Sequence, residues 1–134
     1  MDNGVTNRPE LGVGIDLVSV ARIERMVDRW GTKFLKRVFT DGEIAYSTSK
    51  ARPGLSLAAR FAAKEAFFKA VSPRNIGGIG FKHIEVVIGE NGNPELVAHG
   101  PARQALAAER AALSISHDRE LAVAIVVTSP EVKA

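Results

Sequence analysis

Residues 55–71 read LSLAARFAAKEAFFKAV, and this stretch decides the fold. It is rich in strong helix formers, and the Ser72-Pro73 pair that follows it ends a helix. At about 100° per residue, small side chains recur along one side of this helix, namely Ala59, Ala63, Ala66 and Ala70. The stretch therefore predicts a long central helix that packs closely against a sheet.

The opposite side of this helix is also partly apolar. Phe61 and Phe68 lie on the flank of Glu65, away from the alanines. One apolar face should meet the domain core, and the other should meet a partner, a ligand or another subunit. The alternative is a helix buried all round, and it would require partners for the charged residues, because buried charges need compensation. These residues are Arg60, Lys64, Glu65 and Lys69.

Upstream of the central helix, the stretch LGVGIDLV at residues 11–18 predicts a short buried strand. Ser19 is a suitable N-cap for a helix through Trp30. Gly31 is its expected stop. A capping-box pair formed by Thr40 and Glu43 predicts a further helix near residues 41–49.

The downstream half predicts mainly strands, with one short helix. The expected strands are residues 81–89, 95–98, 112–116 and 121–127, and the expected helix runs from Pro101 through Arg110. Strands and helices mix without βαβ regularity, so the expected class is α+β, with a mostly antiparallel single sheet around the central helix. We expect one domain over residues 11–134 and a disordered tail over residues 1–10, which have little to bury.

Composition limits the function classes. The chain has 134 residues, 46% of them hydrophobic, and no cysteine, so disulfides, thiolate metal sites and cysteine nucleophiles are excluded. The polar N-terminus lacks the apolar core of a signal peptide, and no stretch approaches a membrane span. These features predict a soluble, cytoplasmic protein that does not enter a membrane.

The positive charges are unevenly distributed. The net charge is only +3, yet six basic residues occur between residues 22 and 37, namely Arg22, Arg25, Arg29, Lys33, Lys36 and Arg37. A local positive surface attracts phosphates, nucleic acid or an acidic protein. The alternative is a solvated helix face without a partner.

Asp16 is unusual because it follows the apolar residues of a buried strand. A carboxylate there needs compensation, which could be a salt bridge to Arg22 or Lys69, a helix cap or a cation. Mg²⁺ binds through one or two carboxylates and keeps several waters, so Asp16 with Glu65 would be a minimal magnesium site. Spacing alone does not pair the two residues.

Three further features carry weaker signals. The glycine-bearing loop RNIGGIG at residues 74–80 offers backbone N–H groups that could hold a phosphate, but it matches no established phosphate-binding motif. His117 ends a strand and is more typical of a turn residue than of a catalyst. Ser114 and Ser116 lack a nucleophile elbow, which argues against a hydrolase triad.

Two segments resemble the signatures of one family. GVGIDLVSVARIE at residues 12–24 resembles the N-terminal signature of holo-acyl-carrier-protein synthases, and RFAAKEAFFKA at residues 60–70 resembles their second signature. The resemblance extends from Leu11 to about Val127. It implies the 4'-phosphopantetheinyl transferase fold and a small trimeric enzyme of fatty acid biosynthesis. The implied reaction is the Mg²⁺-dependent transfer of 4'-phosphopantetheine from coenzyme A to a serine of apo acyl carrier protein, with release of adenosine 3',5'-bisphosphate.

The resemblance also implies roles for individual residues. Asp16 and Glu65 would hold Mg²⁺. The positions expected near coenzyme A are Arg60, Lys64, Lys69, Gly77, Gly78, Gly80 and His117. The positions expected to bind the acidic carrier protein are Arg22, Met26, Arg29 and Phe61.

In the implied reaction the carrier serine attacks the β-phosphorus of the coenzyme A pyrophosphate. This attack needs charge neutralisation more than covalent help. Lys69 would share the developing charge with the metal. The base that accepts the serine proton is Glu65, a metal-bound water or His117, and the sequence does not choose among them.

Two rival functions remain at this point. A non-enzymatic basic adaptor that binds RNA or an acidic protein would explain the cations, but it leaves Asp16 and Glu65 without a role. The strands carry almost no aromatic residues for base stacking, which argues against a nucleic-acid partner. A relative that acts on peptide synthetase or polyketide carrier domains would be built from two such halves, and this chain is too short for that.

We also expect a homotrimer with active sites between subunits. The resemblance supplies the number three. The residues supply a separate reason, because apolar strands in so short a chain leave area that its few helices cannot cover. In such a trimer, His117 of one subunit would complete the site that Asp16 and Glu65 form in another.

Overall fold

A computed structural model describes residues 11–71 and 77–130 of the chain. The expected disordered tail at residues 1–10 lies outside the described residues. The elements follow in this order: β1 (Gly12–Ser19), α1 (Val20–Trp30), α2 (Thr32–Val38), α3 (Asp41–Thr48), α4 (Pro53–Val71), the 3-10 helix η2 (Phe81–His83), β2 (Ile84–Ile88), β3 (Pro94–Ala98), α5 (Pro101–Leu106), β4 (Glu109–His117) and β5 (Leu121–Pro130).

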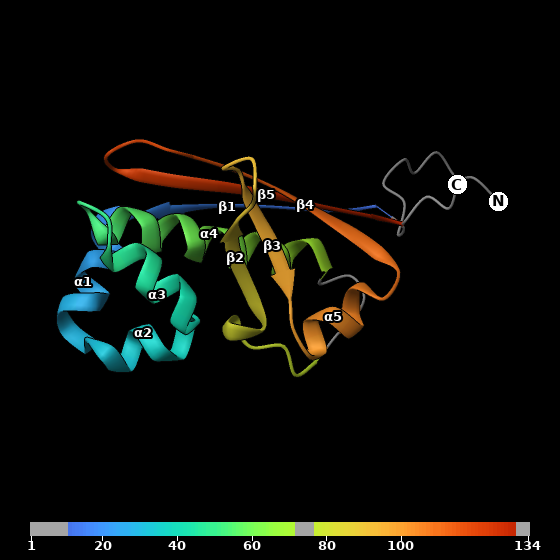
Figure 1. Cartoon of the computed structure of the whole chain (residues 1–134), viewed down its shortest axis with the longest axis horizontal. Helices are drawn as coiled ribbons and strands as arrows, with labels where there is room; N and C mark the ends of the chain where they lie inside the picture. The colour runs from blue at the N-terminus through green and yellow to red at the C-terminus, as the bar shows by residue number, and fades with distance from the viewer. Residues whose placement is uncertain (1–10, 72–76, 131–134) are drawn as a thin grey trace.

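The strands form two antiparallel sheets (Figure 1). The larger sheet has the order β1-β5-β4, and the smaller one is the hairpin of β2 and β3. This arrangement confirms the predicted α+β class with antiparallel pairing and a long central helix. The expectation of a single sheet is wrong, because the β2–β3 hairpin pairs only with itself.

The long helix α4 packs under the larger sheet, as its alanine side predicts (Figure 1). The contact is so close that strand β1 requires glycine at two positions. A Cβ atom on Gly14 would lie 1.9 Å from the carbonyl oxygen of Ala66, and one on Gly12 would lie 2.4 Å from that of Ala70. Real side chains do not tolerate such distances. The glycines of the first signature therefore pack directly against the alanines of the second signature.

The two faces of the larger sheet differ in their environment. The face toward α4 is buried through residues such as Ala122, Ala124 and Val126, which join the core around Phe67. The other face carries large exposed apolar side chains, namely Leu11, Val13, Ile15, Leu17, Leu121 and Ile125. In the described part of the chain no helix lies over that face (Figure 1). The protomer thus leaves one side of its sheet uncovered.

Most helix boundaries agree with the predictions. In α1 the Ser19 hydroxyl accepts a hydrogen bond from the Arg22 N–H at 3.2 Å, and Gly31 has the positive φ of 54° that favours glycine. The capping box of Thr40 and Glu43 is formed at the start of α3. The expected residues therefore begin and end these helices.

Three elements differ from expectation. The strand expected over residues 81–89 begins only at Ile84, because Phe81–His83 form the 3-10 helix η2. The short helix α2 was not predicted; it buries Phe34 and Val38. The helix α5 ends at Leu106 instead of continuing to Arg110. It stops because Ala107 has a φ of 52° and β4 begins at Glu109, so the chain turns into the sheet.

Candidate active site

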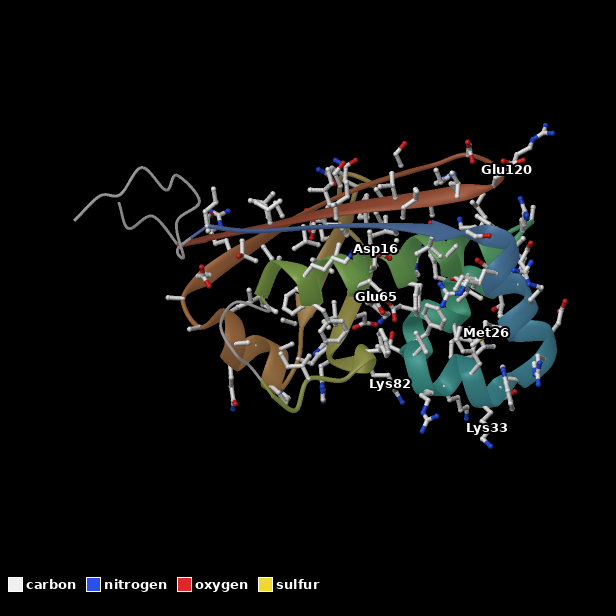
Figure 2. All side chains as sticks on the ribbon, turned by 180° about the vertical axis from the view of Figure 1, so that it is seen from behind. Asp16, Met26, Lys33, Glu65, Lys82 and Glu120 are labelled. Atoms are coloured by element: carbon white, nitrogen blue, oxygen red, sulfur yellow. The ribbon has the colours of Figure 1, made fainter. Side chains whose placement is uncertain are left out.

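Asp16 and Glu65 come together where β1 packs on α4 (Figure 2). Asp16 pairs with the buried Ala124 in the sheet register, so its side chain lies on the face toward α4. Burial raises the pKa of Glu65 above its ordinary value, and the negative charge of Asp16 raises this pKa further, whereas Lys69 and Arg22 lower it. The structure thus establishes the pairing that spacing alone could not.

Lys69 is the charged partner of Asp16. Its Nζ atom lies 3.1 Å from Asp16 Oδ1 and donates a further hydrogen bond to the carbonyl oxygen of Ile15 at 2.9 Å. Of the predicted compensations for Asp16, the salt bridge to Lys69 is present. The cap of the following helix belongs to Ser19. Lys69 is exposed, so its ammonium group can also face a ligand at this position.

The donor set at this position fits Mg²⁺. We call Asp16 and Glu65 the carboxylate pair. Burial and the charge of Asp16 together raise the pKa of Glu65 more than Lys69 and Arg22 lower it, and a bound cation would stabilise both carboxylates in their charged form. Within residues 11–71 and 77–130, no group of three or more His, Cys, Asp or Glu side chains could hold a metal ion. A cation on the carboxylate pair would therefore take further oxygens from water and from a ligand, as Mg²⁺ does.

We expect Glu65→Gln to raise the melting temperature at pH 7 in the absence of Mg²⁺. A carboxyl group with a raised pKa destabilises the fold above that pKa, and this effect disappears as the pH falls through it. Because Glu65 is only partly buried, the expected rise is about 1–3 °C. Calorimetry at pH 7 and pH 3 measures this difference, and the melting temperatures of the wild type and the variant should be equal at pH 3. An equal or lower melting temperature of the variant at pH 7 would contradict this reading of the site.

A cavity of about 470 Å³ lies on another side of α4. It is bounded by α3, the first half of α4, the smaller sheet and the end of β4, and we call it the α3–α4 cavity. Its lining residues are Tyr46, Lys50, Ala51, Arg52, Leu55, Ser56, Ala59, Arg60, Ile88, Pro94, Ile115 and His117. Two of the predicted site residues, Arg60 and His117, therefore meet there.

Arg60 is the buried cation of this cavity. Its side chain donates hydrogen bonds to Ser56 Oγ at 2.8 Å and to the Ser56 carbonyl at 3.3 Å, and its guanidinium lies 4.2 Å from the ring centre of Tyr46. Among the described residues, its buried Nε atom has no hydrogen-bond partner. Burial lowers the pKa of Arg60. An anion in the cavity would stabilise the partly desolvated charge of Arg60.

The sequence reasoning missed the other polar residues of the α3–α4 cavity. Tyr46 lies in the last turn of α3, and Lys50 and Arg52 lie in the segment between α3 and α4. Arg52 is held by Glu24, with Nε–Oε2 and Nη2–Oε1 distances of 3.0 and 2.9 Å. The excess of cations just before the second signature was the available signal.

Lys64 does not lie where the resemblance suggested. Its side chain is fully buried, and its Nζ lies 2.7 Å from Glu43 Oε1. Lys64 therefore has no exposed surface for a phosphate, and the predicted contact is wrong for this protomer. Gly77, Gly78 and Gly80 are not among the described residues that line the α3–α4 cavity. The Gly80 N–H donates to His83 Nδ1 at 2.8 Å.

A second cavity, of about 490 Å³, is apolar and lies between the first helices and α4. We call it the aromatic groove; its lining residues are Met26, Trp30, Lys33, Phe34, Arg37, Val38, Phe61 and Phe81. Met26 and Phe61, two of the residues predicted to bind a carrier protein, meet in it. The exposed Arg22 and Arg29 flank Met26 in a shallow neighbouring depression on α1. All four predicted positions thus lie on one continuous surface.

The helix α4 is buried around most of its circumference, which favours the alternative of an all-round buried helix. Phe61 and Phe68 both pack on Phe81, with ring centres 5.6 and 5.4 Å apart. Two of the four charges have the carboxylate partners that this alternative required, because Lys64 pairs with Glu43 and Lys69 pairs with Asp16. Phe61 still borders the aromatic groove, so part of the phenylalanine side remains available.

Comparisons with known proteins agree with this arrangement. The profile of the 4'-phosphopantetheinyl transferase superfamily matches residues 12–126. A holo-[acyl-carrier-protein] synthase of Carboxydothermus hydrogenoformans is 47% identical over 117 residues, which cover 85% of this chain and 94% of the relative. The holo-[acyl-carrier-protein] synthase of Koribacter versatilis is 45% identical over 120 residues, which cover 87% of this chain and 96% of the relative.

Solved structures give the same result. The holo-[acyl-carrier-protein] synthase of Helicobacter pylori in complex with coenzyme A has a TM-score of 0.75 and 35% identity, covering 87% of this chain and 99% of that one. The synthase of Bacillus anthracis in complex with CoA (3',5'-ADP) has a TM-score of 0.71 and 34% identity, covering 90% and 96%. The match in profile, sequence and structure spans both signatures and all the elements that hold the carboxylate pair. The chain therefore belongs to the 4'-phosphopantetheinyl transferase superfamily.

Proposed function

We propose that this protein is a holo-[acyl-carrier-protein] synthase, a transferase that moves 4'-phosphopantetheine from coenzyme A to a serine of apo acyl carrier protein. Close relatives that carry this name cover nearly the whole chain. The single observation that carries the proposal is the carboxylate pair with Lys69 beside it. A non-enzymatic adaptor leaves this arrangement unexplained. The product, an acyl carrier protein that carries phosphopantetheine, would serve fatty acid biosynthesis.

The residues of the carboxylate pair have a clear part in such a reaction. When bound, Mg²⁺ would neutralise charge on the pyrophosphate that the serine attacks. Asp16 and Glu65 would hold it, and Lys69 would place its ammonium group beside the same phosphate oxygens. Glu65, with its raised pKa, is also a candidate to accept the serine proton.

The α3–α4 cavity suits the nucleotide part of coenzyme A. Arg60 offers a buried guanidinium with an unpaired Nε, and His117 lies at the same cavity. These groups favour a phosphate, and Tyr46, Leu55 and Pro94 supply apolar area for a base. Arg60 and His117 are therefore our candidates for nucleotide binding.

A trimer would bring the two sites together between subunits. Arg60 and Glu65 are five positions apart on α4, which places them about 140° apart around the helix. The carboxylate pair and the α3–α4 cavity thus face different directions in one protomer. The uncovered apolar face of the larger sheet gives a surface for association. We propose that coenzyme A bridges the carboxylate pair of one subunit and the cavity of its neighbour.

A direct assay tests the proposed function. The purified protein is incubated with apo carrier protein, coenzyme A and Mg²⁺, and the carrier is analysed by mass spectrometry. We expect a mass increase equal to one phosphopantetheine on the serine, and none without Mg²⁺. An unmodified carrier under these conditions would overturn the proposal.

Charge reversal on α1 should weaken carrier docking selectively. Arg22 and Arg29 are exposed, and an acidic carrier helix would meet them. We expect Arg22→Glu and Arg29→Glu each to raise the KM for carrier protein about tenfold, with the KM for coenzyme A unchanged. Added salt should weaken wild-type docking, since exposed charges are screened. Steady-state kinetics with each substrate varied in turn measure this, and Lys36→Glu on α2 is the control.

The proposal includes a cytoplasmic location, where coenzyme A and carrier proteins would be available. Among the described residues, no helix is long and apolar enough to cross a membrane. Cysteine is absent from the sequence, which fits a reducing compartment.

A further inference from the structure

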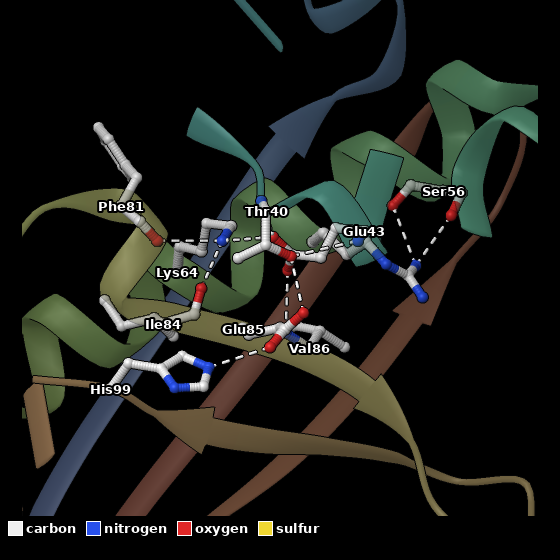
Figure 3. Close-up of polar contacts among 10 residues, drawn as sticks. Thr40, Glu43, Ser56, Lys64, Phe81, Ile84, Glu85, Val86 and His99 are labelled. Atoms are coloured by element: carbon white, nitrogen blue, oxygen red, sulfur yellow. Dashed lines mark hydrogen bonds and ion pairs between the residues drawn. The ribbon is translucent and has the colours of Figure 1, made fainter. Parts of the chain in front are cut away.

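A fully buried ion pair joins three separate parts of the fold (Figure 3). Lys64 on α4 and Glu43 on α3 lie 2.7 Å apart, and both side chains are 0% exposed. The Lys64 ammonium also donates to the carbonyl oxygen of Phe81 at 3.0 Å and to that of Ile84. It thus holds the two ends of the 3-10 helix η2 against α4.

Glu43 is equally constrained. One of its oxygens accepts the Thr40 N–H at 2.9 Å in the capping box, and the other accepts the Val86 N–H at 2.9 Å (Figure 3). The carboxylate therefore connects the start of α3 to β2 while it compensates the charge of Lys64. Lys64 and Glu43 therefore hold the backbone between Phe81 and Val86 in place through hydrogen bonds at Phe81, Ile84 and Val86.

This arrangement is not explained by stability alone. A buried ion pair adds little net stability, because desolvation offsets the attraction, and apolar residues of similar size often replace it without loss. Burial lowers the pKa of Lys64, which is the sign of that desolvation cost. A charged pair in this position can instead fix backbone geometry, since the three N–H donors of the ammonium reach a carboxylate and two carbonyl oxygens together.

The geometry that Lys64 fixes belongs to the aromatic groove. Phe81 lines this groove, and its ring stacks on Phe61 with centres 5.6 Å apart. Its carbonyl is the group that Lys64 holds. The backbone at Phe81 is therefore hydrogen-bonded to Lys64 of α4, while the Phe81 ring forms part of the surface that would receive a carrier protein.

We propose that Lys64, compensated by Glu43, is a positioning residue for carrier docking: it sets the 3-10 helix so that Phe81 completes the aromatic groove. This inference rests on the proposed function, because it takes the groove as the carrier site. Lys64 acts through Phe81 and touches neither substrate. Its neighbour Glu65 points about 100° away on the same helix and serves the carboxylate pair.

The chain contains one tryptophan, and it lies in the groove, which provides a direct measurement. The full-length protein is titrated with an apo carrier that lacks tryptophan, without coenzyme A, and the fluorescence of Trp30 gives the Kd. The test variant is Lys64→Met/Glu43→Gln, in which the introduced glutamine can keep the capping box. We expect its Kd to be about tenfold weaker, with its KM for coenzyme A within about twofold of wild type.

Three further variants show whether Lys64 acts through Phe81. Phe81→Ala should weaken docking by a similar factor, and adding it to the double variant should cause little further loss, because coupled residues are not additive. Glu85→Gln is the matched control, since Glu85 bonds Thr40 and His99 beside the pair without holding η2. Its carrier Kd should not change.

Several results would overturn the inference. A folded double variant with wild-type carrier Kd would do so, as would full additivity with Phe81→Ala. If the double variant does not fold, the apolar pair Lys64→Met/Glu43→Leu replaces it, and failure of both would mean a purely structural role. If Phe81→Ala and Arg22→Glu also leave the carrier Kd unchanged, the proposed carrier surface itself is wrong.

Discussion

Asp16→Asn and Glu65→Gln should each reduce the rate of phosphopantetheine transfer by about 10²- to 10³-fold, the range found when one preorganised electrostatic contact to a transition state is removed. Both changes keep the size of the side chain and remove the charge that a cation requires. The core is unaffected, because the carboxylate pair lies at the edge of the contact between β1 and α4. Transfer is followed by mass spectrometry of the carrier at several Mg²⁺ concentrations.

The control for this prediction is Glu120→Gln, which changes an exposed carboxylate in the β4–β5 turn, away from the pair (Figure 2). Circular dichroism should show all three variants folded, and Mg²⁺ should raise the melting temperature of the wild type and of Glu120→Gln only. Near-normal transfer by either pair variant at limiting Mg²⁺ would refute the metal assignment.

The double variant Ile15→Glu/Leu17→Glu should sediment as a monomer and lose transfer activity almost completely. The two side chains are 53% and 62% exposed on the uncovered face of the larger sheet. Carboxylates at these positions could not be desolvated in an interface without partners. If the active site forms between subunits, the monomer keeps both half-sites but cannot join them, and we expect a loss of about 10²-fold or more.

Glu95→Lys is the control, because it changes an exposed charge on the smaller sheet. Its association state and activity should match the wild type. A folded, fully active monomer of the double variant would refute the intersubunit site.

Subunit exchange tests the same site in a second way. The Glu65→Gln and His117→Ala proteins are mixed in equal amounts and allowed to exchange subunits, provided that the His117 variant alone is inactive. About a quarter of the interfaces should then combine the intact carboxylate pair of one subunit with the intact cavity of the next. Activity restored to about that fraction of wild type is expected. No recovery after confirmed exchange would place both residues in one subunit.

Local patterns were sufficient to predict much of the fold. The 3.6-residue period of residues 55–71 predicted α4 and its alanine side. Caps at Ser19 and Thr40 placed two helix starts. These predictions are correct because helix periodicity and capping depend mainly on residues that are close together in the sequence. The seven-residue helix α2 was missed because it offers too short a period and too many charges.

By itself the sequence determined the superfamily, the α+β class and the identity of the carboxylate pair, because both signatures are contiguous motifs. Only the tertiary structure decided that Asp16 faces Glu65, that Arg60 and His117 share a cavity, and that there are two sheets. It also separated Lys64 from Lys69, which look alike in the sequence. One is buried against Glu43 and the other lies exposed beside Asp16. Helical period determines the direction in which a side chain points, whereas the packing of distant segments determines what it meets there.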